Sequence, residues 1–243
     1  MGAGAFTAIR LASGAVLLLP FLRQRPSVAD LPGAAALLIY AAAFGFAYLT
    51  LGAATGALIL FATVQATIIG YGALRGAVLS RREWAGLGVA ALGVAWLLLP
   101  HAGSPDPKAA ALMAVAGMAW GGYTLLGRKA GDATGRTSRA FLLAAPFGLL
   151  LPLFDADTGI GGTGVILAIL SGALASGIGY VIWYRAAPCL SLGALAASQL
   201  ATPAVAAAGA VLFLAEPMSF GLAAAGIVTL AGVGLAMTAR QPT

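Results

Sequence analysis

The sequence predicts an all-α membrane protein, a bundle of nine transmembrane helices. Three observations support this fold class. Of 243 residues, 61% are hydrophobic and only 8% are charged, whereas a soluble domain uses about 25% charged residues to cover its surface. The mean hydropathy is +0.99. The hydrophobic residues gather in runs of about 20, the length that crosses the hydrocarbon core of a bilayer as a helix. A soluble enzyme is therefore excluded.

Prolines, glycines and charge clusters separate the hydrophobic runs from one another. We expect helices at about residues 4–22, 33–51, 53–74, 84–100, 108–127, 140–154, 162–184, 188–214 and 219–238. The sixth run is the shortest. None of the nine has the alternating polar and apolar pattern of a membrane barrel strand.

Basic residues follow every second run, in order along the chain: Arg23 and Arg25; Arg75, Arg81 and Arg82; Arg128, Lys129, Arg136 and Arg139; Arg185; and Arg240. The alternate connections hold one basic residue, Lys108, and the acidic residues Asp106, Asp155, Asp157 and Glu216. Cytoplasmic loops carry the excess of Lys and Arg. The net charge of +6 therefore indicates orientation in a bacterial inner membrane, with the N-terminus outside and the C-terminus in the cytoplasm, and no nucleic-acid partner is expected.

The sequence also repeats itself at a slowly drifting offset. The matched pairs are Leu17–Pro20 with Leu149–Pro152, Tyr48 with Tyr184, Gly56 with Gly193, Ser80 with Ser219, and Gly93 with Gly232. The first four runs then correspond to the last four. The run at 108–127 is left without a counterpart, which we expect would lie before residue 1. A unit of five helices is odd, so its second copy is inverted in the membrane. We expect two domains: residues 1–103, a repeat without its first helix, and residues 104–243, a complete repeat.

On these features the chain resembles the drug/metabolite transporter superfamily, EamA type. The specific motifs are Gly117–Tyr123, Ser176–Tyr184 and the stretch from Gln199 to Pro217. Pro203 and Glu216, thirteen residues apart, resemble the repeat signature of that family, although Ala77 stands in the first repeat where Glu216 stands in the second. The resemblance implies ten helices in two five-helix repeats, with both termini in the cytoplasm, and it implies export of metabolites or amino acids.

Polar side chains in the middle of apolar helices are candidates for the substrate site, because each costs free energy unless it is paired. Gln65 lies mid-run, and the repeat offset places it opposite Thr202, three residues beyond Gln199. Repeat transporters bind substrate at such matched midplane positions. The alternative is a hydrogen bond that only holds the helices together.

Aromatic residues supply the remaining candidates for substrate binding. Tyr40, Trp120 and Tyr180 lie deep in their runs, and Ser176 shares a face with Tyr180. Either these aromatic side chains line a cavity for the solute, or they only fill space between the helices. Arg10, about two turns into the first run, either reaches back to the membrane surface or anchors a substrate carboxylate.

These patterns predict a transporter of small organic solutes that exports amino acids or related metabolites by alternating access. Its expected partners are the small-molecule substrate and the lipid bilayer. One histidine, His101, and one cysteine, Cys189, cannot form a zinc or iron site, so no cofactor is expected. No acidic or histidine side chain lies mid-helix, which favours a uniporter over proton coupling.

The sequence leaves two alternative functions open. The absent first helix is compatible with a non-transporting membrane fragment or assembly partner. A membrane-embedded enzyme would need a cluster of histidine or acidic residues at one membrane face, and the sequence has none.

Overall fold

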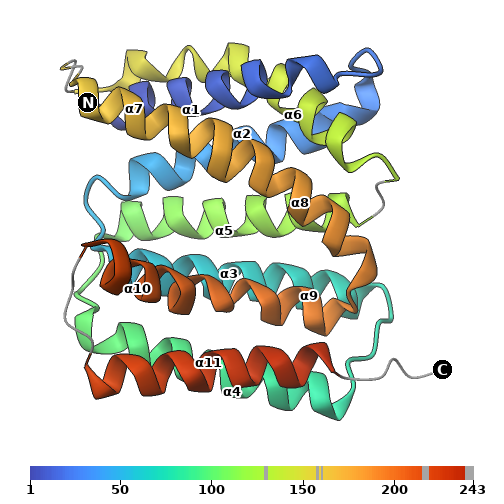
Figure 1. Cartoon of the computed structure of the whole chain (residues 1–243), viewed down its shortest axis with the longest axis vertical. Helices are drawn as coiled ribbons and strands as arrows, with labels where there is room; N and C mark the ends of the chain where they lie inside the picture. The colour runs from blue at the N-terminus through green and yellow to red at the C-terminus, as the bar shows by residue number, and fades with distance from the viewer. Residues whose placement is uncertain (129–130, 157–158, 160, 215–218, 239–243) are drawn as a thin grey trace. The chain divides into compact units, whose positions relative to one another are not determined.

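A computed structural model describes residues 1–128, 131–156, 159, 161–214 and 219–238. Within those residues the chain is helical with no strand (Figure 1). The helices form two compact units. Unit 1 contains Met1–Thr50 and Pro107–Cys189, and unit 2 contains Leu51–Asp106 and Leu190–Thr243. Each unit therefore draws helices from both halves of the sequence.

Unit 1 contains α1 (Ala3–Leu18), α2 (Leu31–Ala47), α5 (Pro107–Gly127), α6 (Ala133–Gly148), α7 (Gly162–Leu170), a π-helical segment (Ser171–Ile178) and α8 (Gly179–Ala186). Short 3₁₀ turns cover Leu19–Phe21, Val28–Asp30, Leu151–Phe154 and Ala187–Cys189. Helices α2 and α5 pack along each other, and α1 packs on α6, α7 and the π segment. In Figure 1, α7 and α8 appear as one long helix coloured from gold to orange.

Asp155 fixes the start of α1. Its carboxylate accepts hydrogen bonds from the backbone N–H groups of Gly4, at 2.7 Å, and Ala5, at 2.8 Å. The first N–H groups of a helix have no partner within the helix, and the helix dipole is positive there. A carboxylate from a distant part of the chain satisfies both requirements.

Unit 2 contains α3 (Ala53–Leu74), α4 (Arg81–Leu98), α9 (Leu192–Gln199), α10 (Ala201–Leu214) and α11 (Phe220–Met237), with a 3₁₀ turn at Leu99–His101. Glycines bring α4 and α11 into backbone contact. A Cβ atom on Gly232 would lie 2.3 Å from the backbone nitrogen of Ala90, and one on Gly93 would lie 2.4 Å from Oγ1 of Thr229. Small residues allow this approach, which is the usual way that helices associate in a bilayer.

Eight helical stretches in the described residues are long and apolar enough to cross a membrane. The ninth expected helix is α6, which has 16 residues and carries Arg136 and Arg139. Large apolar side chains face outward along the spans, among them Phe213 and Phe220, which are 86% and 88% exposed. A water-soluble surface does not expose apolar area on this scale, so these side chains are placed for contact with lipid.

Helix α6 begins earlier than the sequence predicted. We expected residues 140–154, whereas the helix covers Ala133–Gly148. The reason is Asp132, whose carboxylate accepts a hydrogen bond from Gly135 N at 2.9 Å and caps the helix. Arg136 and Arg139, expected in a connection, consequently lie within the first two turns of α6.

The expected helix 188–214 is two helices, α9 and α10, separated at Leu200. Pro203 accounts for the break, because its nitrogen cannot donate to the carbonyl of Gln199 four residues earlier. The chain tightens instead, and Leu200 N donates to Ala197 O at 2.9 Å. Gln199 and Thr202 therefore belong to different helices.

Candidate functional site

The side chain of Arg10 is bound inside unit 1. Its Nε donates to Ser176 Oγ at 2.9 Å, and its Nη2 donates to Tyr180 OH at 2.9 Å. The guanidinium carbon lies 5.6 Å from the centre of the Tyr40 ring, within the range of a cation–π interaction. The side chain of Arg10 is thus held by partners within unit 1 and does not extend back along α1 to the membrane surface.

Close packing of α1 on the π segment brings Ser176 to Arg10. A Cβ atom on Gly172 would lie 2.0 Å from the carbonyl oxygen of Arg10, and one on Gly14 would lie 3.0 Å from the carbonyl oxygen of Gly172. Ser13 Oγ also donates to Ile169 O at 3.4 Å. The two glycines thus allow the backbones to touch, and the π-helical turn sets the direction of Ser176. Such turns are frequent at functional sites.

Aromatic rings surround the guanidinium and its partners. Trp120 lies 4.9 Å from Tyr40 and 4.7 Å from Tyr180, measured between ring centres. Tyr123 lies 5.7 Å from Trp120 and 5.8 Å from Tyr180, and it stacks on Tyr184 at 4.7 Å. These separations are those of interacting aromatic pairs. The cluster offers π faces and hydroxyl groups beside one positive charge.

A cavity of about 260 Å³ leads to Arg10. Its wall is made by the first turns of α1 and the last turns of α2, with Arg10, Phe44 and Tyr48 among its lining residues. The rings of Phe44 and Tyr48 meet edge to face at 4.7 Å. A solute in this cavity would contact aromatic rings along its length and the guanidinium at one end.

Arg10 contacts no carboxylate within the described part of the chain. Its partners there are two hydroxyl groups and a ring face. A cation at this depth is costly in free energy unless a counter-charge is present. The hydroxyl oxygens orient the guanidinium without neutralising it, so its charge remains available to an anion.

The glutamine candidates lie in unit 2. Gln65 donates from Nε2 to the carbonyl of Ala196 at 2.8 Å, while its Oε1 is buried and has no hydrogen-bond partner among the described residues. Gln199 is 7% exposed. Thr202, in the next helix, is exposed, so it does not share the buried surroundings of Gln199.

The structure therefore brings four of the candidates together in unit 1: Tyr40, Trp120, Ser176 and Tyr180. Arg10, for which the sequence left two interpretations open, lies with them, and so does Tyr123, which the sequence had not placed among the candidates. Small residues beside Arg10, Ser13 and Gly14, were the available signal, because they mark the helix face that packs most closely. Glu216 lies outside the described residues.

Three comparisons place the chain among known proteins. Residues 107–238 match the EamA-like transporter family. The chain is 45% identical over 241 residues to the uncharacterized protein PA1977 of Pseudomonas aeruginosa, and the match covers 97% of this chain and 84% of that protein. One crystal structure is similar with a TM-score of 0.79 and 18% identity, over 97% of this chain and 87% of that one. The last likeness concerns the fold alone.

Proposed function

Because the chain belongs to the EamA-like transporter family and is a multi-pass membrane protein, we propose that it carries small organic solutes with a carboxylate group, foremost amino acids. The proposal rests on one observation. Arg10 sits at the end of a cavity with no carboxylate partner among the described residues, held by Ser176 and Tyr180. An arginine binds a carboxylate with two parallel hydrogen bonds, so the carboxylate of the solute supplies the missing counter-charge.

The aromatic cluster suits the other part of such a solute. Tyr40, Trp120 and Phe44 present ring faces and edges near the guanidinium, and apolar side chains of amino acids gain free energy by contact with them. In unit 2, the buried Oε1 of Gln65 is an acceptor with no hydrogen-bond partner among the described residues. We retain Gln65, Gln199 and Thr202 as proposed substrate contacts on the basis of their matched positions in the repeat.

The direction, mode and membrane orientation belong to the same proposal. The carrier exports its solute from the cytoplasm across a bacterial inner membrane by alternating access, with its C-terminus in the cytoplasm. It works as a uniporter. In support, Asp30 and Glu83 lie in the first turns of helical stretches and Asp155 caps α1, so these three carboxylates have structural partners at helix ends.

We also propose that residues 1–103 and 104–243 are the two repeats. The repeat matches Ser80 with Ser219, and both serines cap helices. Ser80 Oγ accepts from Glu83 N at 3.2 Å, and Ser219 Oγ accepts from Leu222 N at 3.1 Å. The matched Leu-Leu-Leu-Pro stretches both run into 3₁₀ turns, at Leu19–Phe21 and Leu151–Phe154. Equivalent sequence positions thus take equivalent local structures.

Transport by the purified protein in liposomes tests the proposal. Wild-type protein should move members of a labelled amino-acid panel. Arg10→Gln should lower the rate by about tenfold to a hundredfold, because a charged hydrogen bond contributes about 1.5–3 kcal/mol. Arg10→Lys keeps the charge without the planar pair of donors and should retain part of the activity.

Arg82→Gln is the matched control, since Arg82 is exposed in unit 2. The Arg82→Gln variant should carry solute at the wild-type rate. Thermal midpoints of all variants separate a lost contact from lost folding. Normal transport by a folded Arg10→Gln protein would remove Arg10 from the mechanism. Wild-type protein that moves no member of the panel would refute amino-acid carriage and favour the assembly-partner alternative.

A further inference from the structure

A second cavity, of about 320 Å³, lies at the opposite end of α2 from the Arg10 cavity. The start of α2, the end of α5 and the start of α6 form its wall. Its charged lining residues are Arg25, Arg136, Arg139 and Asp30, and Tyr123 and Tyr184 also line it. Three arginines therefore face one aspartate, which leaves the lining with a positive excess.

Arg139 is buried in this wall without enough partners for its donors. The residue is 8% exposed. Its Nε donates to Asp30 Oδ1 at 2.9 Å, whereas its Nη1 is buried and forms no hydrogen bond in the described part of the chain. Asp132 Oδ2 lies 3.9 Å from Nη1, an ion-pair separation that is too long for a hydrogen bond. A buried donor of a charged group in this state is costly in free energy.

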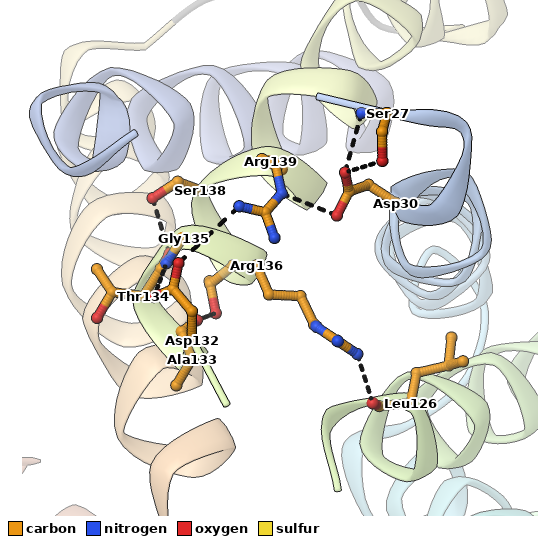
Figure 2. A network of polar contacts seen from close by, with 11 residues as sticks. Ser27, Asp30, Leu126, Asp132, Ala133, Thr134, Gly135, Arg136, Ser138 and Arg139 are labelled. Carbon is orange, nitrogen blue, oxygen red and sulfur yellow. Dashed lines mark hydrogen bonds and ion pairs between the residues drawn. The ribbon is translucent and has the colours of Figure 1, made fainter. Parts of the chain in front are cut away.

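The carboxylate of Asp30 cannot neutralise the cavity further, because it is already engaged on several sides. Figure 2 shows it between Arg139 and Ser27. Ser27 donates to Asp30 Oδ2 from its backbone nitrogen and from Oγ, each at 3.0 Å. Asp30 therefore holds Arg139 in place and stabilises the turn before α2. It supplies no counter-charge to Arg25 or Arg136.

The other two arginines have donors to spare. Among the described residues, the side chain of Arg136 makes one hydrogen bond, from Nη1 to the carbonyl of Leu126 at 3.0 Å. Figure 2 shows this extended side chain crossing from α6 toward α5. Arg25 is exposed. A guanidinium has five N–H donors, so this group of three offers charge-assisted hydrogen bonds that the described protein atoms do not use.

We propose that this cavity is a second anion site, which binds the oxyanion of the transported solute at the basic end of unit 1. The inference rests on the proposed function, since it names where the same solute is received. The aromatic cluster lies between the two sites: Tyr123 and Tyr184 line this cavity, and Tyr180, 5.8 Å from Tyr123, binds Arg10. A solute carboxylate thus has an arginine partner at each end of the cluster.

Equilibrium dialysis of radiolabelled inorganic phosphate against the full chain in a neutral detergent tests the site. Wild-type protein should bind phosphate, and sodium acetate should compete with it. Arg136→Gln and Arg25→Gln should each weaken binding about tenfold, the effect of one charge-assisted hydrogen bond. Neither residue pairs with a carboxylate in the described structure, so neither change leaves a buried acid unpaired. The exposed Arg82→Gln variant is the matched control and should bind as wild type.

The same measurement in lipid nanodiscs separates the two sources of an oxyanion. Nanodiscs of phosphatidylcholine alone and nanodiscs with added phosphatidylglycerol should give equal phosphate affinity if a solute is the ligand. Loss of phosphate binding only in the presence of phosphatidylglycerol would overturn the assignment in favour of a lipid headgroup. Absence of binding by wild type, or equal affinity in Arg136→Gln, Arg25→Gln and wild type, would also overturn it. This experiment measures phosphate binding and not transport. Its result is therefore independent of the transport assay on Arg10→Gln, and the second site can be refuted without refuting the proposed function.

Discussion

At the scale of single residues, the hydroxyl of Tyr180 is the group whose role is most easily separated from folding. It accepts a hydrogen bond from Arg10 Nη2 at 2.9 Å, and Ser176 holds Nε independently. Tyr180→Phe keeps the ring and removes this acceptor. We expect the KM for the carried amino acid to rise about tenfold with little change in thermal midpoint. Transport kinetics and a melting curve on the same preparation check this, and an unchanged KM would show that Tyr180 does not orient Arg10.

The site residues differ in how well sequence alone could find them. Tyr40, Trp120, Ser176 and Tyr180 were predicted because aromatic and hydroxyl side chains stand out deep in apolar runs. Arg10 was harder to assign, because seven residues from the start of α1 is about 10 Å, a distance its own side chain can span to the surface. Its two hydrogen-bond partners, Ser176 and Tyr180, are more than 160 positions away in the sequence, and nothing local indicates them.

At the scale of helices, Glu83 ties α4 to α9. Its Oε2 accepts from the backbone nitrogen of Ser80 at 2.7 Å, and its Oε1 accepts from Ser191 Oγ, the cap of α9. Glu83→Gln should lower the free energy of unfolding by about 1–3 kcal/mol. Ser191→Ala should lower the free energy of unfolding less in the Glu83→Gln background than in wild type, since the two residues share one contact. Thermal unfolding of the two single variants and the double variant measures the coupling, and strict additivity would contradict it.

Helix boundaries show where the sequence is a weaker guide than it is for fold class. The nine apolar runs predicted the helices, because hydrophobic length is a strong signal. The start of α6 was missed because Asp132 caps a turn that is polar, and the apolar run begins only later. The break at Leu200 was missed because a proline inside an apolar run is compatible with a kink as well as with two helices. Both errors concern backbone hydrogen bonds, which composition does not report.

At the scale of the whole molecule, orientation in the membrane is the prediction to test. Reporter fusions after Arg25, Arg82 and Gly131 should read as cytoplasmic, and fusions after Asp106 and Asp155 as external, because the basic connections face the cytoplasm. Gly131 suits a fusion because it precedes α6, which begins at Ala133. An external signal at Gly131 would overturn the orientation.

The π-helical segment Ser171–Ile178 makes the Arg10 site more sensitive to length than to side-chain identity. A π turn holds one more residue than an α turn, so it is an insertion that the fold has kept. Deleting Ala175 would close the wide turn into regular α-helical turns without rotating the helix beyond it, because the wide turn already absorbs the extra residue. Ser176 lies within that turn, so its hydrogen bond with Arg10 Nε would be lost. We expect a single-residue deletion here to abolish transport even where Ala175→Gly is tolerated, and related carriers that lack this residue would have to hold their arginine by other means.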